Sequence, residues 1–439
     1  MEISVIGMGY AGAVTAACLS ELGHHVVGYD IENDRINSLA SKKSDVYEPR
    51  LDDLISKNVD LGRLHFKHIT ESNTTLGEVA IITVGTPSDS SGLPNMEYIW
   101  KSVEWATNNL QSDSILMMRS TVQPGTGNTI SKQFCEPKQI NYVSCPEFLR
   151  EGTAVENFFH PDRIIIGSNH ADSIKKIADL HADISAPIIK TKPIAAEMIK
   201  FASNAFLATK ISFINEMANF CEAWGIEIDD VKEGLGLDPR IGRRFLNAGV
   251  GFGGSCLPKE TKAFTALASK HGIESNLLEA VLQVNYRQTQ LPIKILGEIF
   301  PDLSRVKVAI LGLTFKPDTD DVRESPAITT AKTLSSLGCE VTCFDPVGND
   351  NSEAILKKSV RFSTSTEESV LECQAVLFMT PWESIKNSDW AHLFSKMKEP
   401  AVLFDGRNAL DPSIMKQIGF TYIGVGRGIS SHNISDITL

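Results

Sequence analysis

The chain has 439 residues, and at roughly 100 to 200 residues per domain this length predicts about two to four domains. Its composition, 42% hydrophobic and 22% charged residues, is typical of a globular protein and excludes a disordered or fibrous one. Lys and Arg number 42 against 54 Asp and Glu, a net charge of −12. This charge argues against nucleic acid or an anionic membrane surface and favours a small molecule or a second subunit as the partner.

The first part of the chain alternates short apolar segments with helical stretches. This pattern predicts a parallel sheet covered by helices. The expected strands are residues 3–6, 25–30, 79–84, 114–118 and 141–144. We therefore expect residues 1–192 to form a doubly wound, Rossmann-like domain.

A glycine-rich turn follows the first expected strand and opens a helix. Gly7, Gly9 and Gly12 form a GxGxxG pattern, and Asp30 closes the next expected strand. The first glycine allows a tight turn, the second lets the backbone approach a pyrophosphate, and the third lets helix and strand pack closely. Asp30 would accept hydrogen bonds from ribose hydroxyls and repel a 2′-phosphate. The pattern predicts an NAD site, and a glycine-rich turn without a ligand is the alternative.

Two further loops follow expected strands of the same sheet. They are residues 84–87, with Thr86, and residues 119–121, with Thr121. Ligands of open α/β sheets lie across the carboxyl ends of the strands, so both loops are candidates for cofactor contact. Ordinary turns rich in Pro and Ser are the alternative interpretation.

Two acidic residues follow the strand expected at 141–144. Glu147 and Glu151 lie four residues apart in the sequence CPEFLRE. Carboxylates at this edge of the sheet could orient a water molecule or bind sugar hydroxyls. A solvated loop explains the spacing equally well.

A long uninterrupted helix is expected at residues 194–224, between Pro193 and Gly225. At about 1.5 Å per residue it is roughly 46 Å long, enough to connect two domains. It is apolar on nearly all sides, so we expect several sides to be buried, one of them by a second subunit. Lys200 and Asn204 share one face of it. A structural ion pair of Lys200 with Glu197 is the alternative to a functional role.

One cysteine lies in an unusual setting, the sequence FGGSCLPKE at residues 252–260. Gly253 and Gly254 allow the backbone to approach a ligand, and Pro258 suits the first turn of a helix. Cys256 is thus expected at a helix N-terminus, where the helix dipole and Lys259 stabilise a thiolate. The other seven cysteines are interpreted as small buried apolar residues.

Strand and helix alternate again from about residue 305. The expected strands are 306–311, 340–345, 375–379 and 401–405, which predict a second doubly wound domain. The expected division is residues 1–192 as a cofactor domain, 193–300 as a helical centre and 301–439 as a second α/β domain.

Two features bear on the cellular compartment. Residues 3–20 are uncharged, but Glu2 stands where a signal peptide needs a basic residue and glycines interrupt the run, so we expect neither signal peptide nor membrane span. The eight cysteines form no CxxC pair and are too sparse for a disulfide framework. A cytoplasmic, reducing location is expected.

Several motifs together resemble those of the UDP-glucose 6-dehydrogenases. They are the fingerprint at 7–12, EFLRE at 147–151, HPDR at 160–163, EMIKFASNAF at 197–206, DPRIG at 238–242, FLNAGVGFGGSCLPKE at 245–260, FKP at 315–317, RES at 323–325 and DGR at 405–407. They occur in the family's order and span nearly the whole chain. The resemblance implies two Rossmann-like domains joined by a long central helix, and a homodimer built on residues 194–224.

The resemblance also implies a reaction. UDP-glucose, two NAD⁺ and water would give UDP-glucuronate and two NADH. Cys256 would trap the intermediate aldehyde as a thiohemiacetal, whose oxidation leaves a thioester that water hydrolyses. Lys200 and Asn204 would steady the oxygen on the reacting carbon. Glu147 and Thr121 would position the water and assist proton transfer.

Binding residues follow from the same resemblance. The implied cofactor contacts are Gly7, Gly9, Tyr10, Ala11, Gly12, Asp30, Arg35, Thr86, Thr121, Glu151, Lys259 and Arg323. The implied sugar-nucleotide contacts are Glu147, Phe148, Leu149, Arg150, Glu151, Lys200, Asn204, Arg240, Phe245, Leu246, Asn247, Ala248, Gly249, Gly253, Lys316 and Arg407. No metal ligand is implied.

One residue departs from the family pattern. Glu260 stands four residues after the cysteine, where the family has Asp. Its carboxylate lies one methylene further out, so we expect slower thioester hydrolysis in an otherwise working enzyme.

Three other activities are compatible with much of the pattern. GDP-mannose 6-dehydrogenase shares the mechanism, but HPDR and DPRIG favour UDP-glucose. A two-electron alcohol dehydrogenase would not need Cys256. A non-catalytic nucleotide-sugar sensor would not need Cys256, Lys200 and Asn204 together.

Overall fold

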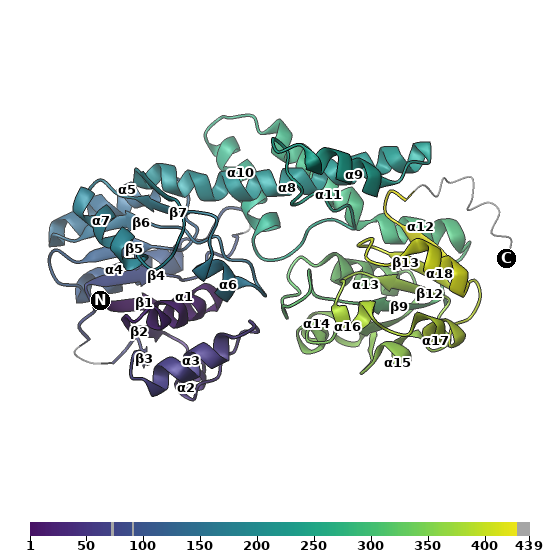
Figure 1. Ribbon diagram of the computed structural model, residues 1–439, viewed down its shortest axis with the longest axis horizontal. Coiled ribbons are helices and arrows are strands. Elements are labelled where there is room, and N and C mark those ends of the chain that lie inside the picture. The colour runs from purple at the N-terminus through teal and green to yellow at the C-terminus, as the bar shows by residue number, and fades with distance from the viewer. Residues whose placement is uncertain (72–73, 90–91, 428–439) are drawn as a thin grey trace. The chain divides into compact units, whose positions relative to one another are not determined.

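The structure is a computed structural model that describes residues 1–71, 74–89 and 92–427 (Figure 1). It separates into two compact units, Met1–Ser203 and Asn204–Leu439. The boundary falls inside helix α8 (Pro193–Trp224). Each unit is described separately.

The first unit is built on a sheet that, among the described residues, has eight strands in the order β3-β2-β1-β4-β5-β6-β7-β8. The strands are β1 (Glu2–Ile6), β2 (His25–Asp30), β3 (Leu64–His68), β4 (Val79–Ile82), β5 (Ile115–Met118), β6 (Asn141–Ser144), β7 (Ile164–Gly167) and β8 (Ile188–Thr191). Pairing is parallel except between β6 and β7. The order reverses at β1, so the loops after β1 and β4 meet where such sheets bind ligands.

Helices cover both faces of this sheet. They are α1 (Tyr10–Glu21), α2 (Asn33–Ala40), α3 (Leu51–Asp60), α4 (Glu97–Asn109), α5 (Thr126–Ile130), α6 (Ala154–Phe159) and α7 (Ala171–Leu180), with the short turns η1 (Ser131–Cys135) and η2 (Glu136–Lys138). Successive strand residues point to opposite faces. Ile81 thus packs in the core under α1, α3 and α7, whereas Ile82 packs under α4.

The second unit begins with the rest of α8 and four further helices, which precede a parallel sheet. The helices before the sheet are α9 (Ile228–Leu237), α10 (Leu257–Lys270), α11 (Asn276–Thr289) and α12 (Leu291–Ile299). The sheet has the order β11-β10-β9-β12-β13-β14. Its strands are β9 (Lys307–Leu311), β10 (Glu340–Phe344), β11 (Arg361–Phe362), β12 (Ala375–Phe378), β13 (Val402–Asp405) and β14 (Thr421–Gly424). This is again a doubly wound order, with its reversal at β9.

Helices also cover the second sheet (Figure 1). They are α13 (Pro326–Ser336), α14 (Asn349–Leu356), α15 (Thr366–Val370), α16 (Glu383–Lys386), α17 (Trp390–Ser395) and α18 (Pro412–Ile418), with the turn η3 (Lys357–Ser359). The core on one face joins strand residues to α8, α12 and α13, and the core on the other joins them to α15, α17 and α18.

The predicted fold class is confirmed. All nine expected strands are present, with ends within two residues of those predicted, and α8 begins one residue earlier than expected, at Pro193. The sequence prediction missed β3, β7, β8, β11 and β14. β3 and β8 are edge strands with partly exposed residues, and β11 has only two residues, so their apolar signal is weak. No helix among the described residues could cross a membrane.

Candidate active site

The glycine-rich turn joins β1 to α1. Gly7 has a φ of +95° and donates from its N–H to Tyr29 O at 2.7 Å. A Cβ at Gly12 would lie 1.8 Å from Gly7 O, so α1 can start directly on the turn only with glycine there. A Cβ at Gly9 would meet nothing within 4 Å. The chain's own packing therefore does not require Gly9, and the open space beside it fits the approach of a pyrophosphate.

The acidic residue at the end of β2 faces this turn. Asp30 Oδ2 accepts from Met8 N at 2.5 Å, and Oδ1 accepts from Glu32 N at 3.0 Å. The Arg35 guanidinium lies 3.5 Å from Asp30 and 2.8 Å from Asp45. The structure thus brings together the turn, Asp30 and Arg35, as a dinucleotide site requires.

The loops after β4 and β5 lie at the same edge of the sheet. The Thr86 hydroxyl donates to Thr121 O at 3.2 Å, which ties the two loops together. Arg119 N and Ser120 N both donate to Ile82 O at 3.0 Å. The two predicted threonines are therefore in contact with each other, and their contact with the cofactor stays a prediction.

Lys200 is paired with Glu147. Its Nζ donates to Glu147 O at 2.8 Å and to Glu147 Oε1 at 3.1 Å, and the Lys200 side chain is only 4% exposed. Burial alone would raise the pKa of the Glu147 carboxyl, but the Lys200 charge, the Leu149 N–H and Arg119 outweigh it and hold that pKa below its usual value. A carboxylate beside a buried ammonium is thus prepared at the predicted catalytic position.

The alternative interpretation of the sequence made Glu197 an ion-pair partner of Lys200, but the Glu197 carboxylate binds backbone N–H groups. Its two oxygens accept from Gly125 N and Gly127 N, each at 2.7 Å, in the loop that follows Thr121. One turn of α8 therefore holds the loop after β5 through Glu197 and the loop after β6 through Lys200. This arrangement has no signal in the sequence beyond the i, i+3 spacing of the two residues.

The predicted substrate segment at 147–151 is packed by the HPDR motif. Arg163 Cζ lies 3.7 Å from the centre of the Phe148 ring, and Lys200 Nζ lies 5.3 Å from it. Arg150 donates from its N–H and its Nε to Asn157 Oδ1, at 3.2 and 3.0 Å. These contacts fix the backbone that carries Glu147, Leu149 and Glu151.

In the second unit, Cys256 is the N-cap residue of α10, with Pro258 in the helix's first turn. The Cys256 side chain is exposed, whereas the other seven cysteines are buried. The Ser255 hydroxyl lies 3.6 Å from Cys256 Sγ. The expected placement of a solvent-accessible thiol at a helix N-terminus is confirmed.

Glu260 lies one turn into α10 and is buried. It accepts a hydrogen bond from Asn204 Nδ2 at 2.6 Å, and the two residues are 2% and 8% exposed. Glu260 therefore fixes the orientation of the Asn204 amide. Sequence reasoning singled out both residues but not their contact, because 56 positions separate them.

The glycines before Cys256 are required by a neighbouring segment of the chain. Gly254 has a φ of +86°, and a Cβ there would lie 2.8 Å from the Phe315 ring. A Cβ at Gly253 would lie 2.4 Å from Glu324 O. The loop between β9 and α13 thus packs directly on the cysteine segment, in addition to any ligand contact predicted for Gly253.

Arg407 is partly buried at the carboxyl end of the second sheet. It donates to Met379 O at 3.0 Å, Gly251 O at 2.9 Å and Phe315 O at 3.4 Å. Burial lowers the pKa of Arg407 to about 10, and Asp405 opposes this shift, so the side chain stays charged at neutral pH. Arg407 therefore holds three loops together, a role that the sequence did not indicate.

The remaining predicted residues of the second unit lie in several loops. Arg240 is exposed and pairs with Asp238 at 2.6 Å. In the segment Phe245, Leu246, Asn247, Ala248 and Gly249, Leu246 and Ala248 are buried, and Gly249 N donates to Asn215 Oδ1 at 2.9 Å. Lys316 lies 5.5 Å from the Phe315 ring centre, and Arg323 pairs with Asp321 at 2.8 Å.

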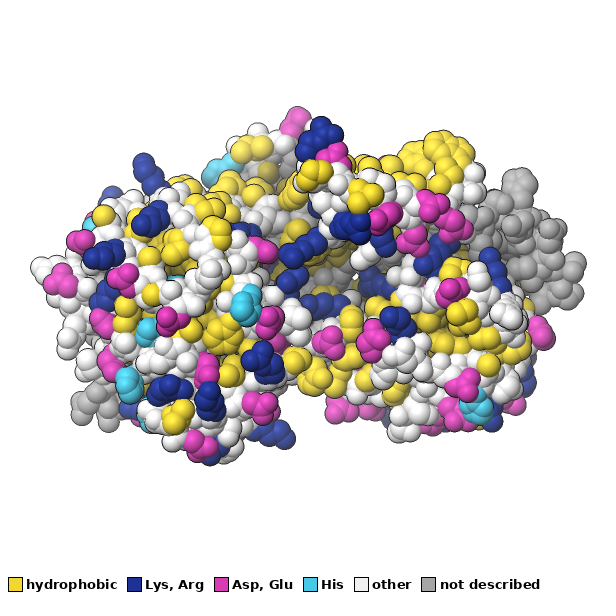
Figure 2. Space-filling view, in the orientation of Figure 1, with side chains coloured by type: hydrophobic (Ala, Val, Ile, Leu, Met, Phe, Trp, Pro, Cys, Tyr) yellow, Lys and Arg dark blue, Asp and Glu magenta, His cyan; other side chains and the backbone are white. Residues whose placement is uncertain are grey.

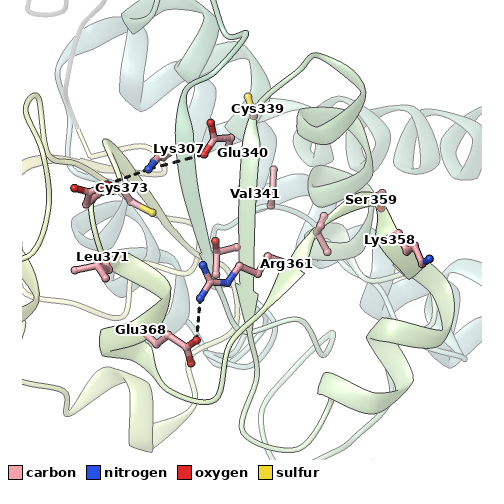
Figure 3. Close-up of a pocket in the computed structure, with 13 residues that line it drawn as sticks. Lys307, Cys339, Glu340, Val341, Lys358, Ser359, Arg361, Glu368, Leu371 and Cys373 are labelled. Atoms are coloured by element: carbon pink, nitrogen blue, oxygen red, sulfur yellow. Dashed lines mark hydrogen bonds and ion pairs between the residues drawn. The ribbon is translucent and has the colours of Figure 1, made fainter.

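A cavity of about 490 Å³ lies elsewhere in the second unit (Figure 3). It is lined by the first residues of β9, β10 and β11, which are Lys307, Glu340 and Arg361. Two pairs of its charged residues are Arg361 with Glu368 at 3.0 Å and Lys307 with Glu372 at 3.1 Å. Ligands of such sheets bind at the carboxyl ends of the strands, so this cavity at the amino ends is not the active site.

A glycine-rich turn with its acid on one sheet, a second doubly wound sheet and an exposed thiol at a helix N-terminus define a nucleotide-dependent α/β dehydrogenase. The sequence matches all three domains of one family, the UDP-glucose/GDP-mannose dehydrogenase family: its NAD binding domain over residues 1–185, its central domain over 194–287 and its UDP binding domain over 309–412. The chain belongs to this family, and its cofactor is NAD.

Individual relatives cover nearly the whole chain. The UDP-glucose 6-dehydrogenase YwqF of Bacillus subtilis is 38% identical over 431 residues, covering 97% of this chain and 98% of the relative. The structure of a UDP-glucose dehydrogenase from Pyrobaculum islandicum has a TM-score of 0.89 and 33% identity, covering 97% of this chain and 98% of that one. A GDP-mannose dehydrogenase from Pseudomonas aeruginosa has a TM-score of 0.54 and 29% identity, covering 97% and 100%.

Proposed function

We propose that this protein oxidises UDP-glucose to UDP-glucuronate in two NAD-dependent steps. The observation that carries the proposal is Cys256, an exposed thiol at the start of α10 in a chain that also has an NAD-binding turn. The similarity to UDP-glucose 6-dehydrogenases over almost the full length supports the choice of substrate. GDP-mannose is the second candidate substrate.

The role of Cys256 follows from the chemistry of aldehyde oxidation. A free aldehyde is a poor hydride donor until a nucleophile adds to its carbonyl carbon. Addition of the Cys256 thiol across the carbonyl would give a thiohemiacetal, and loss of hydride from that carbon together with the proton of its hydroxyl would leave a thioester. Water then cleaves the carbon–sulfur bond, which releases the carboxylate and restores the thiol. The turn at 7–12 and Asp30 would hold NAD⁺, which would supply the hydride acceptor for the two oxidations.

The residues around α8 support this sequence of steps through charge and proton transfer. Lys200 carries a buried positive charge that would stabilise an oxyanion on the reacting carbon. Asn204, oriented by Glu260, would donate a second hydrogen bond to that oxygen. Despite burial, the Lys200 charge and the Leu149 N–H hold the pKa of Glu147 below its usual value. Glu147 would position the hydrolytic water and assist its proton transfer, with Thr121 helping to position that water.

Counting NADH per sugar nucleotide distinguishes the candidate functions. With UDP-glucose and excess NAD⁺ we expect two NADH per sugar consumed. One NADH per sugar, with activity retained in Cys256→Ala, would identify a two-electron alcohol dehydrogenase. Turnover of GDP-mannose but not UDP-glucose would identify the other substrate, and binding without any NADH would identify a sensor.

We propose that Glu260 slows the last step compared with an aspartate at the same position. Its carboxylate is engaged by Asn204 and lies one methylene further from the α10 backbone than an aspartate would. In single-turnover experiments, Glu260→Asp should hydrolyse the thioester faster than the parent. An equal or slower rate in the variant would contradict this role.

The division into 1–192, 193–300 and 301–439, with a homodimer formed through the central part, is also proposed. In the second unit Phe206, Phe213 and Phe220 follow one another at seven-residue spacing along α8 and are 64%, 46% and 46% exposed. Trp224 extends this row, and apolar side chains cover the end of α8 and α9 in Figure 2. An exposed apolar row of this kind is typical of a helix that packs against a partner. Light scattering should give the mass of two chains, and the mass of one chain would refute the dimer.

A reducing compartment, the cytoplasm, is proposed as well. Cys256 is exposed and must stay a thiol to act as a nucleophile. Fractionation of the native host should place the protein with cytoplasmic markers, and recovery with secreted proteins would overturn the proposal.

A further inference from the structure

A buried carboxylate that no predicted site includes lies at the start of α1. Glu48 belongs to the loop between α2 and α3 and is 7% exposed. Its Oε2 accepts hydrogen bonds from the Tyr10 hydroxyl and from Gly152 N, the latter at 2.6 Å. Its Oε1 accepts from Ala154 N at 2.7 Å and Val155 N at 3.2 Å. One side chain thus joins three segments that are distant in sequence.

Tyr10 provides the link to the glycine-rich turn. It follows Gly9 directly and is the first residue of α1. Its hydroxyl donates to Glu48 and accepts from Gly152 N at 3.0 Å. Burial, followed by the hydrogen bond to Glu48, raises the pKa of Tyr10 far above its usual value, so the hydroxyl remains a donor at all ordinary pH values. Tyr10, Glu48 and Gly152 therefore form a closed hydrogen-bonded triangle.

The triangle of Tyr10, Glu48 and Gly152 lies next to residues that are predicted to contact the cofactor. α1 packs against both α3 and α6, α3 begins three residues after Glu48, and α6 begins two residues after Gly152. Gly152 also follows Glu151, a predicted cofactor contact. The carboxylate thus sets the position of the start of α1 relative to the turn at 150–155. A buried carboxylate is stable only while its hydrogen bonds are made, so these segments are held in one arrangement.

We propose that Glu48 and Tyr10 form a clamp that positions the glycine-rich turn and the 150–155 turn for the NAD dinucleotide, with Glu48 as a positioning residue. The backbone N–H groups at the start of α1 must lie at fixed places to bind the pyrophosphate. This inference rests on NAD binding by the family and not on the proposed sugar substrate. The contacts of Glu48 differ from those of a simple helix cap, because a side chain that only capped α6 would not bind Tyr10.

Equilibrium binding of NAD⁺ to the full chain, followed by calorimetry, tests the clamp. In Glu48→Gln an amide NH₂ replaces one acceptor and faces backbone donors, so NAD⁺ should bind about tenfold more weakly. Tyr10→Phe removes only the hydroxyl and should weaken NAD⁺ binding about threefold to fivefold. The double variant should be no weaker than Glu48→Gln by more than about twofold, because both changes break the same link. UDP affinity should be unchanged in all three.

Glu21→Gln is the matched control. Glu21 is the last residue of α1 and ties that helix to α3 through Lys57 at 2.6 Å and Asn58 at 2.9 Å. It lies roughly 16 Å along α1 from Tyr10, so its loss should leave NAD⁺ affinity within about twofold of the parent.

Several results would overturn the clamp. One is a Glu48→Gln variant that binds NAD⁺ as tightly as the parent. Another is a Glu21→Gln variant that loses as much NAD⁺ affinity as Glu48→Gln. A third is a parallel loss of UDP affinity, which would show a general loss of structure. If Glu48→Gln does not fold, Tyr10→Phe decides, and a folded Tyr10→Phe protein with parent-like NAD⁺ affinity refutes the proposal.

Discussion

The two sheets of the molecule begin in the same way and then differ. Each opens with a strand followed by a glycine in the left-handed region, Gly7 at φ +95° and Gly312 at φ +86°. Each of these glycines donates to the end of the neighbouring strand, Gly7 N to Tyr29 O at 2.7 Å and Gly312 N to Phe344 O at 2.8 Å. The common frame is therefore a tight turn after the first strand of a doubly wound sheet.

The acidic residues at the end of the second strand of each sheet, Asp30 and Asp345, make different contacts. Asp30 accepts from Met8 N and Glu32 N and is 7% exposed. Asp345, by contrast, is 1% exposed. Its Oδ2 accepts from Leu313 N, Thr314 N, the Thr314 hydroxyl and Trp382 Nε1, and its Oδ1 accepts from Val347 N and Gly348 N. The protein itself thus occupies the acceptor sites that a ribose would need.

The residues after the first glycine explain this difference. Where the first turn has Gly9 and Gly12, the equivalent positions of the second turn are Thr314 and Pro317. The Thr314 side chain fills the space beside Asp345, and the next helix, α13, does not begin until Pro326. The same initial turn is therefore predicted to bind a dinucleotide in one unit, and in the other it is the start of a long loop before α13.

The largest expected effect tests the third glycine of the first turn. Gly12→Ala places a Cβ 1.8 Å from Gly7 O, so it should abolish NAD⁺ binding and lower the free energy of unfolding by about 3–5 kcal/mol. Gly9→Ala is the matched control, because a Cβ there meets nothing. It should cost less than about 1 kcal/mol of stability and still weaken NAD⁺ binding. Chemical denaturation and calorimetry measure both effects, and equal stability losses would contradict the assignment.

Substitution by asparagine should mainly lower stability at Asp345 and mainly weaken NAD⁺ binding at Asp30. Asp345→Asn leaves buried donors without their acceptors and should lower the free energy of unfolding by about 2–4 kcal/mol, with NAD⁺ affinity unchanged. Asp30→Asn should cost about 1 kcal/mol of stability and weaken NAD⁺ binding. Urea titrations and NAD⁺ titrations of both variants check the contrast, and a loss of NAD⁺ affinity in Asp345→Asn would break it.

Trp382→Phe removes one of the hydrogen-bond donors that surround Asp345 in the second unit. The indole Nε1 donates to Asp345 Oδ2 at 3.1 Å and Thr314 Oγ1 at 3.0 Å, and its removal should cost about 1–2 kcal/mol. Trp390→Phe in α17 is a suitable control, since its Nε1 donates to the helix carbonyl Lys386 O and not to Asp345. If Trp382→Phe proved as stable as the parent protein, the contacts of Asp345 would not depend on this donor.

The smallest expected effect concerns pH and the first unit. Burial raises the pKa of Glu197 to about 7, against the opposing hydrogen bonds from Gly125, Gly127 and Tyr142. Because this folded pKa lies above the unfolded one, the contribution to stability is fully present below about pH 4.5 and is lost as pH rises through 7. Stability should therefore fall from pH 6 to pH 8 by about 1 kcal/mol more in the parent than in Glu197→Gln. Parallel curves from thermal unfolding in this range would show that Glu197 does not titrate there.

Much of the secondary structure could be predicted from the sequence alone. Apolar runs located nine strands, and the glycine spacing with Asp30 predicted an NAD site in the turn after β1. The glycines and Pro258 around Cys256 placed that thiol at a helix N-terminus. These features are local: they depend on backbone conformations and helix termini that neighbouring residues fix, so they can be recognised without the fold.

The hydrogen-bond partners of the buried polar groups became known only from the fold. The hydrogen-bond partners of Arg407 lie 28 positions away, at Met379, and 156 positions away, at Gly251. Glu48 binds Gly152, which is 104 positions away. A buried charge must find donors or acceptors, but the sequence does not say which ones, because the packing of sheets and helices brings them together. The sequence thus showed where the chemistry resides, and the fold showed what holds it in position.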